Sequence, residues 1–197
     1  VSGRLHTPYH IKFEHTKPLD KEIDEQLKYF YHLFNAFDST SVISQVNQNR
    51  DIRVDTLFQK VFKKALEVSA ETNGAYDVTC APLINLWGFG FSRKDSVTPA
   101  HIDSVRQSIG FQKVRLEGDR IVKDDPRLMM NFSSLADGTA CDMIAQMLEK
   151  KGVRNYLVEF GGEMRVKGVN PSDMDWRLGS TKPTDDAAGM NQELEQI

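Results

Sequence analysis

The strongest constraint on the fold is an amphipathic pattern in the first half of the chain. Apolar side chains recur there every three or four residues, at Val54, Leu57, Phe58, Val61, Phe62, Ala65 and Val68. This spacing places them on one face of a helix, and that face must be buried against another element. Glycine readily takes the left-handed conformation in which many helices end, so Asn73-Gly74 is a natural stop. The pattern therefore predicts a long helix that ends near Gly74.

The same reasoning predicts further helices. Apolar residues at helical spacing indicate a helix over residues 20–34. Thr98-Pro99 is typical of a helix start, with threonine as the N-cap and proline in the first turn, and Gly110 would close that helix. A fourth helix is predicted from about Thr139 to Lys151.

Short apolar runs between these helices predict strands. They are YHIKFE, KVRL, RIVK, LMMNF, NYLVEF, MRVKG and WRLGS. Glu117-Gly118-Asp119 is expected to turn KVRL back onto RIVK as a hairpin, and Gly161-Gly162 to break the chain after NYLVEF. The fold class is therefore α+β, with helices packed against one mostly antiparallel sheet. Because no low-complexity linker divides the chain, we expect a single domain over residues 1–197.

Composition excludes several classes of function. The chain has a formal net charge of −3 and an isoelectric point near 6.0, which argues against a nucleic-acid surface. No apolar run is long enough to predict a membrane-spanning helix. The five histidines and two cysteines lack the spacing of common metal motifs, and no GxSxG, Walker or GxGxxG motif occurs.

The first stretch that could carry chemistry is GAYDVTCAPLINLWGFG, residues 74–90. It has the composition of neither a helix nor a strand. Its glycines would let a ligand approach the backbone, and its aromatic rings offer flat surfaces to a planar group. The alternative is a packed surface loop in which Trp87 fills a gap in the core.

Two other stretches are weaker signals. NFSSLADGTACD, residues 131–142, leads from a predicted strand into a helix, where backbone N–H groups attract anions and oxygen atoms can hold Mg²⁺. Taken by itself, the stretch favours the alternative of an ordinary helix start capped by Ser134 or Asp137. VEFGGEMRVKG, residues 158–168, could admit a phosphate or ribose, or it could be a tight turn.

Taken together and in this order, these stretches resemble the FAD:protein FMN transferase family, the ApbE-like proteins formerly called thiamine-biosynthesis lipoproteins. The resemblance spans nearly the whole chain, and its most specific part is ETNGAYDVTCAPLINLWGFG. Weaker matches are FNAFDSTSVISQVN, YLVEFGGEMRVKG and WRLGSTKPTDD. It implies an ApbE-like, T-fold-like architecture, of which this sequence is expected to be the N-terminal part.

The resemblance also implies a reaction. Family members bind FAD and, with Mg²⁺, split its pyrophosphate, transfer FMN to a threonine of an acceptor protein and release AMP, while some relatives hydrolyse FAD. Many are lipoproteins of the bacterial periplasm. We therefore expect a membrane-anchored periplasmic transferase with a lipid anchor ahead of this sequence.

By the same resemblance, the FAD-contacting residues are expected at Leu5, Phe37, Ala75, Tyr76, Asp77, Asn131 and Asp137. The backbone carbonyl of Ser134 is expected to ligate Mg²⁺, and Trp87 to brace the Gly74 turn. The Ala75–Asp77 corner and the Asn131–Asp137 bend should lie side by side and cradle the dinucleotide. The catalytic residues themselves are expected beyond Ile197.

Some residues depart from the family pattern. Asn131 replaces an acid and Asp137 replaces a longer, usually basic side chain; Thr139 and His6 also differ. An acid beside a pyrophosphate repels it unless a metal or proton intervenes. We therefore expect impaired or absent transfer by this chain. The alternatives are a non-catalytic protein that binds flavin or another nucleotide, and a degenerate family member that serves as a scaffold.

Overall fold

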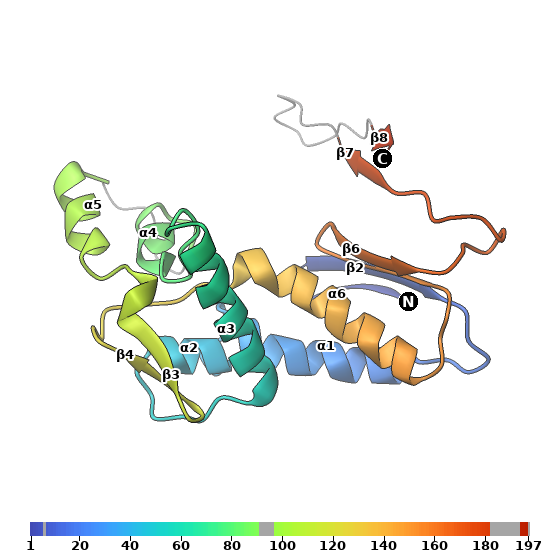
Figure 1. The fold of residues 1–197 in the computed structure, drawn as a ribbon, viewed down its shortest axis with the longest axis horizontal. Helices are drawn as coiled ribbons and strands as arrows, with labels where there is room; N and C mark the ends of the chain where they lie inside the picture. The colour runs from blue at the N-terminus through green and yellow to red at the C-terminus, as the bar shows by residue number, and fades with distance from the viewer. Residues whose placement is uncertain (6, 91–96, 182–193, 197) are drawn as a thin grey trace. The chain divides into compact units, whose positions relative to one another are not determined.

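The computed structural model describes residues 1–5, 7–90, 97–181 and 194–196. The chain forms two compact units (Figure 1). Unit 1 consists of Val1–Pro18 and Cys141–Ile197, and unit 2 of Leu19–Ala140. The single domain expected over residues 1–197 stays a prediction, because two such units can belong to one folding domain.

Unit 1 is built on a four-stranded antiparallel sheet with the strand order β1-β2-β5-β6. Its strands are β1 (Ser2–Leu5), β2 (Thr7–Phe13), β5 (Tyr156–Phe160) and β6 (Glu163–Lys167). Alternate residues of β5 are buried, as expected for a sheet with one face on a core. Gly161 and Gly162, with φ of 64° and 96°, make the tight turn into β6.

The part of helix α6 that belongs to unit 1 packs against this sheet. α6 spans Ser133–Lys150, and Ile144, Ala145 and Leu148 are buried along it. Glu149 accepts hydrogen bonds from the Tyr156 hydroxyl at 2.7 Å and from Lys167 Nζ at 3.1 Å, which lower the pKa of its carboxyl group. A separate two-stranded sheet pairs β7 (Gly179–Thr181) with β8 (Leu194–Gln196).

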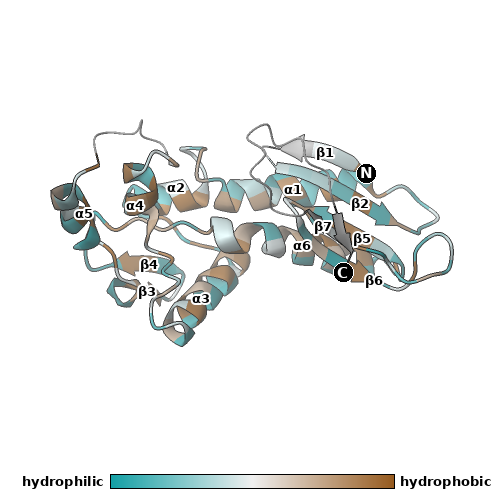
Figure 2. Ribbon diagram, turned by 90° about the horizontal axis from the view of Figure 1, so that it is seen from above, coloured by the Kyte–Doolittle hydropathy of each residue, from teal (hydrophilic) through white to brown (hydrophobic). Residues whose placement is uncertain are grey.

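Among its described residues, unit 2 contains five complete helices, the first part of α6 and a hairpin. The helices are α1 (Asp20–Phe34), α2 (Val42–Asn47), α3 (Thr56–Glu71), α4 (Ala81–Leu86) and α5 (Pro99–Arg106). Strands β3 (Val114–Glu117) and β4 (Arg120–Lys123) form the hairpin, preceded by a short 3-10 turn, Phe111–Lys113. Both α1 and α3 carry hydrophobic and hydrophilic bands in Figure 2, as amphipathic helices require.

Three phenylalanines form the centre of the core of unit 2. Phe58 of α3 is fully buried and stacks on Phe34 of α1, with ring centroids 5.4 Å apart. Phe132 meets both rings edge-on, at 5.8 Å from Phe34 and 5.5 Å from Phe58. Such aromatic contacts add to the hydrophobic stabilisation of the core. They also hold Phe132, and with it the segment that leads into α6, against α1 and α3.

Most predicted elements are confirmed, as is the α+β class. The helix over residues 20–34 and the hairpin are found where they were expected. α3 ends before Asn73 and Gly74, whose φ values are 51° and 81°, and the Thr98 hydroxyl accepts a hydrogen bond from the His101 N–H as the N-cap of α5.

Other expectations were wrong. The LMMNF run is not a strand: within the described structure, only Met129 makes an isolated bridge, to Cys80. α6 begins at Ser133 rather than near Thr139, so neither Ser134 nor Asp137 is its N-cap. The GAYDVTCAPLINLWGFG stretch contains helix α4, which begins just before Pro82. In the WRLGS run, only its last residues belong to a strand. The described strands form three separate sheets rather than one.

We predict that Phe58→Ala lowers the free energy of unfolding by about 3–5 kcal/mol, because it removes a buried ring and leaves a cavity. Urea denaturation followed by circular dichroism measures this loss. Phe89 is 79% exposed and provides the control. Phe89→Ala should change the same quantity by about 0.5 kcal/mol or less. Equal effects of the two substitutions would contradict the core assigned here.

Candidate functional site

A cavity of about 330 Å³ lies within unit 2. It is lined by Ala36, Phe37, Ala81, Ile84, Asn85, Phe89, Gly90, Met130, Asn131 and Ser133. The lining is mostly apolar, with a few polar side chains, which is the usual composition of a small-molecule site. Its volume is near the lower end of the range for such sites, about 300–1,000 Å³.

The two bends expected to cradle a ligand lie next to each other. The Asn131 N–H donates to the Val78 carbonyl oxygen at 2.8 Å, and Cys80 forms a bridge with Met129. The Ala75–Asp77 corner, which immediately precedes Val78, is thereby joined to the segment that enters α6. The predicted juxtaposition of the two bends is confirmed.

The Asp77 carboxylate holds the protein's own backbone. It accepts hydrogen bonds from the Thr79 N–H at 2.8 Å, from the Thr79 hydroxyl at 2.6 Å and from the Phe111 N–H at 3.1 Å. The Thr79 hydroxyl in turn accepts from the Gly110 N–H at 2.8 Å. This network fixes the corner to the turn after α5. The structure therefore gives Asp77 a role in shaping the site, and contact between its side chain and FAD stays a prediction.

Tyr76 carries an unusual hydroxyl group. Its oxygen is buried and has no hydrogen-bond partner among the described residues. Burial raises the pKa of this phenol, while the neighbouring Ser134 side chain lowers it in part without making a hydrogen bond of normal geometry. A buried hydroxyl without a partner destabilises a protein, and such groups occur where a ligand or water completes the contact.

The start of α6 is organised by Asn131. Its side-chain oxygen accepts from the Ser133 N–H at 2.8 Å, so it satisfies one of the free N–H groups at the helix start. Ser134 and Asp137 lie inside the helix, Ser134 in the first turn and Asp137 just beyond it. The helix N-terminus carries a partial positive charge that favours anions.

The remaining predicted residues are distributed as follows. Phe37 lines the cavity and is 67% exposed, whereas Ala75 is exposed and is not part of the lining. Leu5 is in strand β1 of unit 1, and its side chain lies outside what the structure describes. Trp87 is 47% exposed, so the alternative in which it fills a gap in the core is wrong.

Sequence reasoning missed several lining residues. Ala81, Ile84 and Asn85 reach the cavity from one face of α4, at the three- and four-residue spacing of a helix. That spacing was present in the sequence, but the glycines and aromatics around it suggested an irregular segment. Phe89 and Gly90 also line the cavity, although the WGFG segment was expected only to brace the corner from behind.

The described residues do not by themselves fit a magnesium site. Within the part of the chain that the structure describes, no group of three His, Cys, Asp or Glu side chains could hold a metal ion. Mg²⁺ prefers near-octahedral oxygen coordination. The Ser134 carbonyl could supply one such oxygen, and this assignment stays a prediction.

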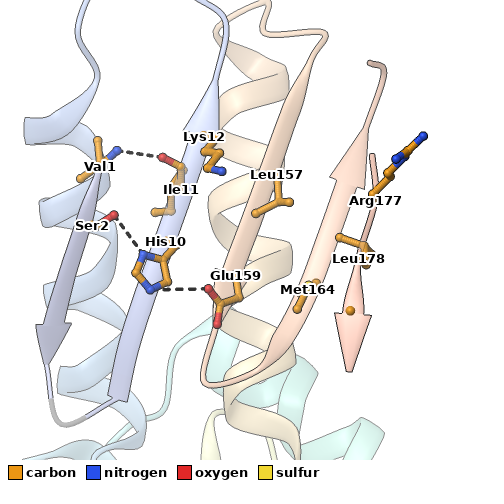
Figure 3. Close-up of a pocket in the computed structure, with 11 residues that line it drawn as sticks. Val1, Ser2, His10, Ile11, Lys12, Leu157, Glu159, Met164, Arg177 and Leu178 are labelled. Carbon is orange, nitrogen blue, oxygen red and sulfur yellow. Dashed lines mark hydrogen bonds and ion pairs between the residues drawn. The ribbon is translucent and has the colours of Figure 1, made fainter. Parts of the chain in front are cut away.

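Another hollow, of about 380 Å³, lies on the outer face of the sheet in unit 1 (Figure 3). His10 lies there between Ser2 and Glu159, with its Nδ1 3.1 Å from the Ser2 hydroxyl. Leu157, Met164 and charged side chains such as Lys12 also line it. The predicted site residues are not among those that line it, so we base the candidate site on the cavity of unit 2.

Comparison with known proteins identifies the family of this chain. Residues 5–196 match the model of the ApbE family. The chain belongs to this family. A curated Vibrio cholerae relative, named FAD:protein FMN transferase, is 34% identical over 96% of this chain and 60% of its own length. A Haemophilus influenzae protein of the same name is 31% identical over 93% of this chain and 58% of its own length.

Solved structures of the ApbE family share the fold. The flavin transferase ApbE from Vibrio cholerae superimposes with a TM-score of 0.88 at 33% identity, covering 100% of this chain and 66% of that one. The apo form of the Pseudomonas stutzeri flavinyl transferase ApbE gives a TM-score of 0.82 at 27% identity, covering 92% of this chain and 62% of that one. This ApbE-family chain thus spans about 60% of the length of its curated relatives. Among the described helices, none is both long and apolar enough to cross a membrane.

We predict that Tyr76→Phe raises the free energy of unfolding by about 1 kcal/mol in the absence of ligand, because it removes a buried hydroxyl without a partner. Thermal and urea denaturation measure the change. A loss of similar size would instead show that Ser134 satisfies the hydroxyl, and Ser134→Ala should then produce the same loss.

We also predict that Asp77→Ala lowers the free energy of unfolding by about 2 kcal/mol without any ligand, because the Thr79 and Phe111 N–H groups lose their acceptor. Asp77→Asn should cost less, since its amide oxygen can still accept from Thr79. Urea denaturation of both variants checks this order. An unchanged stability of Asp77→Ala would contradict the structural role of this carboxylate.

Proposed function

We propose that this chain forms the FAD-binding part of a Mg²⁺-dependent FAD:protein FMN transferase. The observation that carries the proposal is the cavity of unit 2, whose lining combines Phe37, the α4 face and the Asn131 bend at the start of α6. Membership of the ApbE family and the printed names of the relatives support it.

The cavity offers suitable surfaces for parts of FAD. Phe37 and Phe89 present exposed aromatic faces to a planar ring, and Ile84 and Met130 add apolar contact. The N-terminus of α6 favours the negative charge of the pyrophosphate. At about 330 Å³, the cavity has room for a ring system rather than for the whole dinucleotide.

The proposed reaction is a phosphoryl transfer. The oxygen of an acceptor threonine attacks the phosphorus on the FMN side of the pyrophosphate, the bond from that phosphorus to the bridging oxygen breaks, AMP leaves with that oxygen, and the hydroxyl proton passes to a base. Such reactions depend on positioning and on neutralising the phosphate charge. The described residues supply positioning, and the Mg²⁺ requirement and the threonine target are predictions from the family resemblance. The periplasmic location and lipid anchor are likewise predictions.

A second candidate function is flavin binding without transfer. It is favoured by the Asn131 side chain, which is neutral where the family resemblance predicts an acid and which already accepts the Ser133 N–H. Asp137 adds a negative charge near the proposed pyrophosphate position, which weakens binding of that group unless a cation intervenes. These two residues make the transfer activity, rather than flavin binding, the property to test.

We predict that the purified chain quenches the fluorescence of free FAD on binding. Phe37→Ala should weaken this binding about tenfold, because stacking on an aromatic face contributes about 1–3 kcal/mol per ring. Met174, 50% exposed in unit 1, provides a control, and Met174→Ala should bind FAD as the unaltered chain does. Equal effects of the two variants would contradict the assignment of FAD binding to this cavity.

Transfer is tested in the same preparation with FAD, Mg²⁺ and an acceptor protein of a flavin transferase. Mass spectrometry should find FMN on a threonine of the acceptor, and chromatography an equal amount of AMP. FAD binding without either product would support the second candidate function. Absence of FAD binding at any concentration would contradict both candidates and favour a scaffold.

A further inference from the structure

We propose that the short helix α2 is a positioning element that sets the spacing between two walls of the cavity, acting through Ser44 and Asn47. The first wall is Ala36–Phe37 and the second is Met130–Asn131, and all of these residues line the cavity. The inference rests on the proposed function for its ligand, FAD. It assigns a role in the site to α2, although no described residue of α2 lines the cavity.

Asn47 holds the second wall. Its side-chain Nδ2 donates to the Met130 carbonyl oxygen at 2.9 Å, and its Oδ1 accepts from the Met130 N–H at 2.8 Å. The asparagine therefore pairs with both backbone groups of one residue, as a neighbouring strand would do. Asn47 is only 8% exposed, so these hydrogen bonds are shielded from water. Removing the amide would leave buried backbone groups unpaired, which a protein avoids by shifting the segment.

Ser44 holds the first wall. Its hydroxyl donates to the Ala36 carbonyl oxygen at 3.3 Å, and Ser44 is 7% exposed. Ser44 and Asn47 are three residues apart on α2, so their side chains lie on the same side of the helix. Gln45 adds a hydrogen bond to the Thr40 carbonyl oxygen at 2.8 Å, in the loop that follows Phe37. Both walls are thus tied to one rigid turn of helix.

Lys123 secures the end of this helix. Its Nζ donates to the Asn47 carbonyl oxygen at 3.2 Å and to the Leu128 carbonyl oxygen at 2.9 Å. Burial lowers the pKa of this ammonium group, which indicates how far it is withdrawn from water. The lysine therefore links α2 to the segment just before the second wall, and it limits the movement of that segment relative to Asn47.

The arrangement matters because neither wall belongs to a helix or a strand. Residues 36–37 and 130–131 have no regular secondary structure, so side chains rather than a ladder of backbone bonds fix their positions. Asn131 also donates its N–H to the Val78 carbonyl oxygen. The position of the second wall therefore affects the position of the Ala75–Asp77 corner. A ligand between the walls would depend on their separation, and displacement by about 1 Å at such a site can reduce function by about a hundredfold.

The test uses matched substitutions in the purified chain. Asn47→Leu and Ser44→Ala remove the two contacts, and Asn47→Asp keeps the shape and the acceptor of Asn47 but loses its donor. Asn155→Leu is the control for the asparagine, because Asn155 in unit 1 accepts from the Val169 N–H at 3.1 Å and donates to Glu14 at 2.7 Å. Ser69→Ala is the control for the serine, because the buried Ser69 hydroxyl donates to Ala65 within α3.

Two quantities separate positioning from stability: the dissociation constant for FAD, from fluorescence quenching well below the melting temperature, and the rise in melting temperature caused by a fixed FAD concentration. Asn47→Leu and Asn47→Asp should weaken FAD binding about tenfold, and Ser44→Ala about threefold, because Asn47 makes two buried hydrogen bonds to the second wall and Ser44 makes one long hydrogen bond to the first. The control variants should lose stability but keep the FAD affinity of the unaltered chain.

The outcomes distinguish the proposed function from the positioning role of α2. If the unaltered chain does not bind FAD, the proposed function is contradicted. If it binds FAD and the Asn47 and Ser44 variants bind equally well, the positioning role of α2 is contradicted while the proposed function stands. If the control variants lose FAD affinity in proportion to their stability, the effect is general destabilisation and the inference is also overturned. If Asn47→Leu fails to fold, Asn47→Asp and Ser44→Ala decide between these outcomes.

Discussion

A backbone hydrogen bond from the Asn131 N–H to the Val78 carbonyl oxygen, next to the bridge between Cys80 and Met129, joins the two bends on which the candidate site depends. Neither bend is stabilised by a sheet. Each is instead fixed by polar side chains that satisfy backbone groups: Asp77 and Thr79 on one side, and Asn47 on the other. This type of construction makes a site sensitive to the loss of single hydrogen bonds, because a buried backbone group without a partner destabilises its surroundings.

Much of the fold could be predicted from the sequence because its helices are amphipathic and because particular residues mark where helices begin and end. Periodicity located α1 and α3, and Thr98 and Gly74 marked helix ends by their individual chemistry. The prediction failed where long-range contacts override local pattern. The LMMNF run is apolar because it is buried, yet at Met130 the backbone hydrogen bonds are made by Asn47, which is far away in the sequence, and not by a neighbouring strand.

The candidate site, too, could be predicted only in part from the sequence. The pairing of the Ala75–Asp77 corner with the Asn131 bend was expected from the family resemblance, and the structure places them together. The part played by α4 was missed because glycines and aromatics on either side obscured a single short helix. The engagement of Asp77 with Phe111 could not be foreseen, since nothing in the sequence around Asp77 indicates a contact with the turn after α5.

The position of Cys80 has a consequence for the reactivity of its thiol. Cys80 lies at the start of α4 beside the Met129 bridge, and burial together with the negative charge of Asp77 raises the pKa of its thiol. Only the thiolate reacts readily with oxidants and disulfides, so this sulfur is protected by its surroundings. Cys141 is buried in α6. The packing that joins the start of α4 to Met129 therefore also makes the Cys80 thiol a poor nucleophile.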